Sequence, residues 1–257
     1  MYELRGVELR LERASEHIDA LKHESAMFQM TLPEPYGHKI PDKAVNGVYV
    51  VRAEISRPPP LRLGVLAIDG AHNLRAALDM IAWEVALKGE DPPPDDDRSV
   101  AFPICTNRDA WESESTNRMI KRISADAVRV IDSFQPYHKP GKFPWHLLAF
   151  IQALDNWGKH KAIPGLLSFR VSRVIVLSST WEVVSFKEGA FEDGDEISRV
   201  RRVEPARDPD EHFRTVMTCH VSFAKDGPGE GFAISYLENA HDFLKHAILP
   251  AFTGFFR

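Results

Sequence analysis

The sequence predicts an α+β protein, with a helical core of about five helices, a C-terminal antiparallel β-meander and a closing C-terminal helix. Apolar residues recur every three or four positions through most of residues 1–165, which is the period of amphipathic helices. Beyond this point the chain is rich in Val, Ile, Phe and Thr in partly alternating order, as in strands. We therefore divide the chain into a mainly helical domain, 1–165, with one strand near 46–56, and a domain 166–257 that packs on it and holds the sheet and the last helix.

The first helix is expected over residues 3–30, because apolar or small residues form a heptad-like stripe along it. The stripe consists of Leu4, Val7, Leu11, Ala14, Ile18, Leu21 and Phe28. Another helix must cover this stripe, either in the same chain or in a second copy. Three prolines then precede a helix over 61–88. The same period predicts further helices over 115–134, 145–162 and 235–252.

The strand-rich part predicts about four strands, over 169–177, 180–187, 196–203 and 212–225. Asp, Gly and Ser separate these segments, as expected for the turns of an antiparallel sheet. In the helical part, the stretch 89–97 combines three prolines with five acidic residues. This composition predicts an exposed acidic loop.

Composition excludes some classes of function. The formal charge is −5, from 32 Lys and Arg residues against 37 Asp and Glu residues, and predicts no general attraction to nucleic acid. RNA is therefore a candidate partner without support from the net charge. Cys105 and Cys219 lie far apart and are expected to be reduced thiols. No run approaches the roughly 18 apolar residues of a membrane span, and the N-terminus lacks the pattern of a secretory signal. We expect a cytoplasmic protein that does not contact the membrane.

Two predicted helices carry closely spaced polar residues. In the helix over 61–88, His72, Arg75 and Asp79 fall within about a third of the helix circumference, at 100° per residue. Trp83 and Ile68 share this sector, which favours partial burial and pairing of the charges. Arg75 and Asp79 are one turn apart and are expected to pair with each other.

The helix over 145–162 repeats the pattern. Asp155 and Lys159 are one turn apart, as are Asn156 and His160. A glycine within this helix, Gly158, costs roughly 1 kcal/mol of helix propensity relative to Ala and indicates a close approach by another segment.

If the two helices pack side by side, one pocket collects polar side chains from both. Its members are His72, Arg75, Asp79, Asp155, Asn156, Lys159 and His160. These residue types serve as general acids and bases and as cations for phosphate. They are also common as structural clamps that fix the register of two helices, and this is the preferred interpretation. We expect no cofactor and assign no metal ligands.

Other features are weaker. His241 and His246 are five apart, so on an α-helix they do not share a face, and surface positions are expected. Arg199, Arg201 and Arg202 make the strand-rich part locally basic, but acidic neighbours favour an ordinary solvated edge over a nucleic-acid surface. The aromatic tail would be costly if exposed and is expected to dock on the core or on a second subunit. Together with the heptad-like stripe, it predicts a homodimer.

The segments 68–79 and 154–161, with Phe102-Pro103-Ile104 between them, resemble a family of uncharacterised bacterial and phage-associated proteins. The motifs are HNLRxALD and DNxxKH(K/R), and the resemblance covers roughly residues 1–165. It implies no established activity. A looser similarity is to HEPN-type helical domains, many of which are ribonucleases of toxin and phage-defence systems. Their signature is an Arg, usually followed by a polar residue, with a His four to six positions on. Here Ala76 follows Arg75 and Met80 stands five positions after it, so the signature is incomplete.

Two classes of function follow from these residues. The first is a binding or assembly module of unknown ligand, in which the two polar faces form a buried inter-helix network. The alternative is a HEPN-like metal-independent ribonuclease of a toxin or phage-defence type, with His72 or His160 as acid and base and with Arg75 and Lys159 stabilising phosphate charge. A metal-dependent hydrolase, with His72, Asp79 and His160 as ligands, is a distant third. Whether the protein is an enzyme stays open.

Overall fold

The computed structural model describes residues 4–40, 44–89, 92, 97–139, 146–160, 168–176, 180–187, 189–203, 215–222 and 233–256. Side chains are described in these ranges except at residues 160, 168–176, 189–190, 215–222 and 233. The chain forms two compact units: unit 1 holds residues 1–22, 64–164 and 233–257, and unit 2 holds 23–63 and 165–232. The units are interleaved along the chain, whereas the prediction divides it once, after residue 165.

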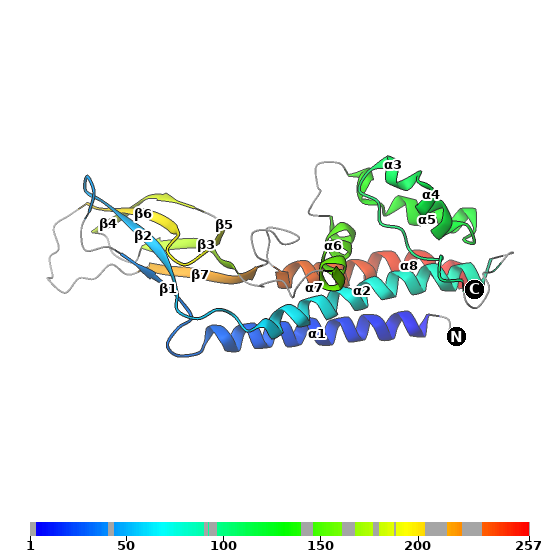
Figure 1. Ribbon diagram of the computed structural model, residues 1–257, viewed down its shortest axis with the longest axis horizontal. Helices are drawn as coiled ribbons and strands as arrows, with labels where there is room; N and C mark the ends of the chain where they lie inside the picture. The colour runs from blue at the N-terminus through cyan, green and yellow to red at the C-terminus, as the bar shows by residue number, and fades with distance from the viewer. Residues whose placement is uncertain are drawn as a thin grey trace. The chain divides into compact units, whose positions relative to one another are not determined.

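The first two long helices form one side of unit 1. α1 spans Arg5–Gln29 and α2 spans Leu61–Leu87, and within unit 1 they run side by side (Figure 1). They are antiparallel, since Gly6 lies against Met80 while Gly70 lies against Ile18. The apolar stripe of α1 is buried in this arrangement, with Val7 and Leu21 fully covered. The chain therefore covers its own stripe, which removes one of the two reasons to expect a homodimer.

A set of short helices replaces the single helix expected over 115–134. They are α3 (Arg108–Trp111), α4 (Glu114–Ile120), α5 (Ala125–Ser133) and the 3-10 turn η1 (Pro136–His138). The prediction of one continuous helix is wrong because Ser124 begins a new one. Its hydroxyl accepts a hydrogen bond from the N–H of Ala127 at 3.4 Å, which satisfies a free donor at the start of α5.

The remaining helices of unit 1 are α6 (Leu147–His160), α7 (Ala233–Phe243), α8 (Leu249–Phe252) and the 3-10 turn η3 (Thr253–Phe256). A π-turn, η2 (Leu244–Ile248), interrupts the predicted C-terminal helix between α7 and α8. Phe252 is fully buried and stacks edge to face on Phe102 at 6.4 Å between ring centroids. The aromatic tail thus begins inside the core of its own unit, which removes the second reason to expect a homodimer.

A close contact joins α6 to α2. A Cβ atom built on Gly158 would lie 2.3 Å from Cγ2 of Ile68 and 3.3 Å from its Cβ, so only glycine fits. This confirms the close approach that the glycine predicts. The core around this contact draws on α2, α6 and α7–α8. Its fully buried side chains include Leu74, Leu78, Leu148, Ile151, Leu154, Leu237 and Ile248.

Unit 2 holds two antiparallel sheets (Figure 1). The first has the order β1-β2-β6-β4, formed by Tyr36–Lys39, Val48–Ile55, Glu196–Arg202 and Trp181–Phe186. The second has the order β5-β3-β7, formed by Gly189–Phe191, Ser168–Val176 and Thr215–Ser222. The presence of both helices and antiparallel sheets in the chain confirms the α+β class. The order differs from a meander, because the early strand β2 pairs with β6.

One apolar cluster draws on both sheets of unit 2. Ala53 and Ile197 from the first sheet are buried together with Phe191 from β5. At the entry to β2, Asn46 and Gly47 have φ angles of 53° and 75°, the left-handed values of a two-residue hairpin turn between Val45 and Val48. The helices that the structure describes include none with both the length and the apolar character of a membrane span.

The glycine contact gives a test of the α2–α6 packing. We expect Gly158→Ala to lower the free energy of unfolding by about 1–3 kcal/mol, because the β-branched Ile68 side chain cannot rotate away from the added methyl. Gly6→Ala is the matched control, since its new Cβ meets only the flexible end of Met80. We expect Gly6→Ala to leave the free energy of unfolding unchanged or to raise it by up to about 1 kcal/mol, because Ala has a higher helix propensity than Gly. Urea denaturation measures both, and a Gly158→Ala protein as stable as the wild type contradicts the packing.

Candidate site at the α2–α6 interface

Arg75 and Asp79 form one half of a polar network between α2 and the segment that follows it. The Arg75 guanidinium donates to both carboxylate oxygens of Asp79, at 3.2 Å from Nε and 2.7 Å from Nη2. Nη2 also donates to the carbonyl oxygen of Phe102 at 2.7 Å, and the N–H of Phe102 donates to Asp79 at 3.0 Å. The backbone of Phe102 is therefore held from both its polar groups. The Arg75 side chain is only 13% exposed.

Asp155 is the centre of the other half. Its carboxylate is 4% exposed and bonds to His72 Nδ1 at 2.9 Å through one oxygen and to Lys159 Nζ at 2.5 Å through the other. The His72 and Lys159 side chains are 51% and 47% exposed. One buried carboxylate thus holds an imidazole and an ammonium group at the surface, one from each helix.

One hydrogen bond to α6 and one electrostatic effect connect the two halves. Arg75 Nη1 lies 3.5 Å from Gln152 Oε1 on α6, at the outer limit of a hydrogen bond. The charge of Lys159 also acts on Asp79, whose pKa is raised by burial against the opposing effects of Arg75, the Phe102 N–H and Lys159.

The structure brings together five of the seven predicted site residues: His72, Arg75, Asp79, Asp155 and Lys159. Asn156 lies on the exposed side of α6, and the side chain of His160 lies outside the described residues. The neighbour of His72 in the first motif points elsewhere, since Asn73 accepts a hydrogen bond from Arg10 of α1 at 3.2 Å. The polar faces of α2 and α6 therefore meet, but as a filled interface with an exposed rim.

Gln135 was not predicted and supports the same segment from the other side. Its side chain, 1% exposed, accepts from the N–H of Cys105 at 2.8 Å and donates to the carbonyl oxygens of Pro103 and Ile131 at 3.0 and 3.1 Å. Segment 102–105 is thus hydrogen-bonded both to α2 and to the end of α5. The sequence held one signal for this role of Gln135, which is a polar residue at the end of an apolar helix face and directly before Pro136.

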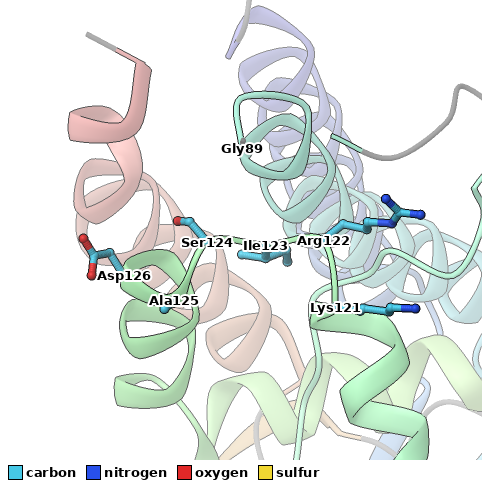
Figure 2. Close-up of a pocket in the computed structure, with 7 residues that line it drawn as sticks. All are labelled: Gly89, Lys121, Arg122, Ile123, Ser124, Ala125 and Asp126. Carbon is cyan, nitrogen blue, oxygen red and sulfur yellow. The ribbon is translucent and has the colours of Figure 1, made fainter. Parts of the chain in front are cut away.

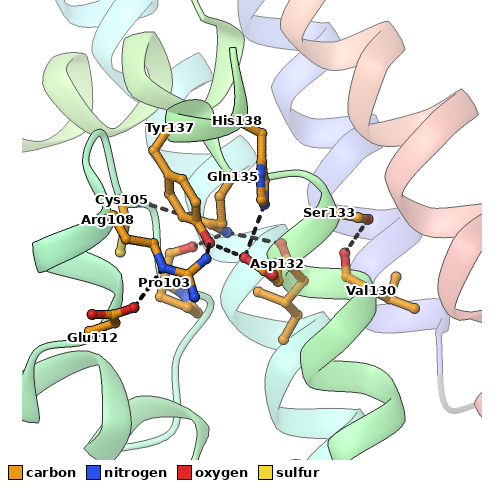
Figure 3. Close-up of polar contacts among 11 residues, drawn as sticks. Pro103, Cys105, Arg108, Glu112, Val130, Asp132, Ser133, Gln135, Tyr137 and His138 are labelled. Carbon is orange, nitrogen blue, oxygen red and sulfur yellow. Dashed lines mark hydrogen bonds and ion pairs between the residues drawn. The ribbon is translucent and has the colours of Figure 1, made fainter. Parts of the chain in front are cut away.

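A second polar cluster joins α3, α5 and η1 (Figure 3). The hydroxyl of Tyr137 donates to Asp132, which also bonds His138 Nε2 at 3.1 Å. Arg108 donates to the Tyr137 hydroxyl at 3.3 Å and to Glu112 at 2.7 Å. Burial and the Asp132 carboxylate raise the pKa of Tyr137 to about 12, so this phenol stays a hydrogen-bond donor. The cluster fastens the short helices to one another.

Two cavities are described in unit 1, and neither is lined by the α2–α6 network. One, of about 410 Å³, lies beside the start of α5 and is lined by Gly89, Lys121, Arg122, Ile123, Ser124, Ala125 and Asp126 (Figure 2). The other, of about 570 Å³, lies between α1 and the π-turn and is lined by Glu8, Leu11, Glu12, Ser15, His241, Lys245, His246 and Leu249. We call the second one the α1–η2 groove.

The α1–η2 groove corrects the expectation that His241 and His246 do not share a face, whereas His246 is exposed as expected. At the π-turn the N–H of Leu249 bonds to the carbonyl of Leu244, five residues back. This wider turn brings residues five apart toward the same side, so both histidines line the groove. The His241 side chain is only 12% exposed. Pro250 explains the irregularity, since a proline has no N–H and its ring clashes with the carbonyl four residues earlier in a regular helix.

Two of the three arginines of the locally basic strand β6 have carboxylate partners within its own sheet. Arg199 pairs with Glu196 at 3.0 Å, and Arg201 pairs with Glu182 at 3.4 Å. Arg202 lies over the ring of Trp181, 5.7 Å from its centroid. These contacts match the solvated edge that the acidic neighbours favour, and they give no support to a nucleic-acid surface.

The raised pKa of Asp79 makes a prediction about pH. In the folded chain Asp79 takes up a proton at higher pH than it does in the unfolded chain. The resulting stabilisation is fully present below the unfolded pKa and is lost as pH rises through the folded pKa. Asp79→Asn removes this titration. We expect the free energy of unfolding of the wild type, relative to Asp79→Asn, to fall between about pH 3 and pH 7 in urea denaturation. A difference that stays constant or grows with pH contradicts the assignment.

The comparisons with known proteins add no relative. No family model, curated protein or solved structure matches the chain. The resemblance of the two helix motifs to a family therefore stays an expectation. What the chain does has to be inferred from the geometry of its own residues.

Proposed function

We propose that the chain is a binding or assembly module, and that the α2–α6 polar network is a structural clamp within it. The observation that carries this proposal is the state of Arg75. Its guanidinium is 13% exposed and donates to Asp79, to the Phe102 carbonyl and, at the limit of distance, to Gln152. A guanidinium that is buried and engaged in this way has little left to offer a substrate phosphate.

The clamp has a clear structural task. Arg75 and Asp79 hold the two backbone polar groups of Phe102, whose ring is fully buried against Phe252. Gln135 holds the next residues from the opposite side. The network therefore fixes an extended segment between α2 and α5 and secures the docking of the C-terminal helices. A rigid helical unit of this kind suits the presentation of a surface to a ligand or a partner. The cytoplasmic location belongs to the same proposal, and so does the homodimer, which would have to form through a surface other than the α1 stripe and the aromatic tail.

The clamp predicts a large loss of stability on truncation. We expect Arg75→Ala to lower the free energy of unfolding by about 2–4 kcal/mol, because it leaves Asp79 and the Phe102 carbonyl without their partner. The partial exposure of Asp79 keeps the loss below that of a fully buried pair. Arg13→Ala is the control, since its pair with Glu16 on α1 is exposed and should cost less than about 1 kcal/mol. Similar small losses in both variants, measured by urea denaturation, would count against the clamp.

A second function is favoured by one observation, the His72–Asp155 pair. A buried carboxylate bonded to Nδ1 orients an exposed imidazole whose other nitrogen is left for a substrate, which is the arrangement of a general base. Lys159 lies on the same carboxylate and supplies a cation for phosphate. In a HEPN-like metal-independent ribonuclease, His72 would take the proton of a ribose 2′-hydroxyl as this oxygen attacks phosphorus. The bond to the 5′-oxygen would then break, with His160 or water protonating the leaving group.

The ribonuclease is tested separately from the clamp. Cleavage of a single-stranded RNA oligonucleotide in the presence of EDTA should be abolished in His72→Ala. This variant keeps the Asp155–Lys159 pair but removes the other partner of Asp155, so its melting temperature is expected to fall, and cleavage is compared at a temperature where both proteins are folded. Lys159→Met should retain part of the activity. If the purified wild type cleaves no RNA, or if His72→Ala cleaves as fast as the wild type, this alternative fails and the binding module stands.

The metal-dependent alternative gains no support from the geometry. His72 is bonded to Asp155 and Asp79 to Arg75, in place of a common centre. Over the part of the chain that the structure describes, no cluster of three or more His, Cys, Asp or Glu side chains is arranged to hold a metal ion.

A further inference from the structure

The α1–η2 groove has walls of opposite charge. On the α1 side, Glu8 and Glu12 share a single cation, Arg5, at 3.1 and 2.9 Å. Two carboxylates against one guanidinium leave this wall with one net negative charge. The two carboxylates are 52% and 56% exposed and remain accessible from the groove.

The opposite wall is basic. Lys245 lines it and forms no ion pair with any residue that the structure describes. His246 lies beside it, exposed, and His241 lies deeper and contacts Asp242 at 3.4 Å. Asp242 itself is outside the groove lining. With neutral histidines, the lining residues of this wall carry one positive charge.

The groove also has an apolar base between the walls. Leu11, which is 4% exposed, and Leu249 contribute to its lining. The volume of about 570 Å³ falls within the range of small-molecule sites, roughly 300–1,000 Å³. The π-turn is what places both histidines and Lys245 along one wall, and π-turns inside helices occur frequently at functional sites.

We propose that the α1–η2 groove binds a short amphiphilic zwitterion. Its ammonium group lies at Glu8 and Glu12, its carboxylate lies at Lys245 and His246, and its apolar body lies on Leu11 and Leu249. A molecule with only one charge leaves one wall unpaired and is repelled by the wall of like charge. Complementarity to both walls therefore selects a molecule that carries both signs at opposite ends. This inference rests on the proposed binding role and names the chemistry of one ligand site for it.

Three probes of equal chain length test the proposal by calorimetric titration of the full chain. They are 6-aminohexanoate, which carries both charges, hexanoate, which carries only the carboxylate, and hexylamine, which carries only the ammonium group. We expect 6-aminohexanoate to bind with the lowest Kd, by roughly two- to fivefold for each charge, since exposed ion pairs contribute up to about 1 kcal/mol. Equal Kd values for the three probes, or no binding of any of them, would overturn the proposal.

Two variants assign the ends of the probe. Lys245→Met should raise the Kd of 6-aminohexanoate to that of hexylamine, and Glu12→Gln should raise it toward that of hexanoate. Lys121→Met is the matched control, because Lys121 is exposed in unit 1 but lines the other cavity. Preference for the zwitterion that survives both groove substitutions places binding elsewhere and overturns the assignment. The clamp is measured by the stability of Arg75→Ala and is unaffected by this outcome.

Discussion

The buried carboxylate of Asp155 is the constraint on which the α2–α6 interface depends. A charge that is 4% exposed is costly unless it is paired, and Asp155 is paired on both oxygens, by His72 and Lys159. The His72 pair forms only because α6 approaches α2 closely enough for Gly158 to rest on Ile68, whereas Lys159 lies one turn from Asp155 on α6 itself. The apolar contact and the polar contact therefore fix the same register. A slip of either helix by one residue would separate the carboxylate from its imidazole.

Burial divides these polar residues into an inner group that supports the fold and an outer group that is accessible to a ligand. Arg75 and Gln135 are almost covered and direct their donors at protein carbonyl and carboxylate groups, so they support the fold. His72 and Lys159 are half exposed and are held at the surface by Asp155. The buried Arg75 and Gln135 favour a structural module. The half-exposed His72 and Lys159 are the residues on which the proposed ribonuclease alternative rests. The cluster of Arg108, Asp132, Tyr137 and His138 contains similar residue types but joins short helices to each other.

Much of the helical architecture was predictable because long amphipathic helices carry their period in the sequence. The limits of α2 were expected within a residue, and the residues that join it to α6 were identified from their spacing.

Ser124 was missed because a serine inside an apolar pattern is compatible with either a helix interior or a helix cap. Gln135 was missed because two of its three partners are backbone groups of Cys105 and Pro103, 30 and 32 residues away, which leave no trace in local spacing. The groove histidines were missed because a π-turn changes the angle per residue on which face assignments rest. The pairing of β2 with β6 joins segments separated by the whole of α2–α6, beyond any local pattern.

The interleaving of the two units also governs how the chain can be divided. Each unit is assembled from segments that the other interrupts, so the backbone passes between them near residues 22, 63, 164 and 232. A fragment ending at 165 would keep β1 and β2 without the strands β4 and β6, and would lack α7 and α8. No single scission yields an intact half. Neither unit can therefore be expressed alone as one continuous stretch of the natural sequence.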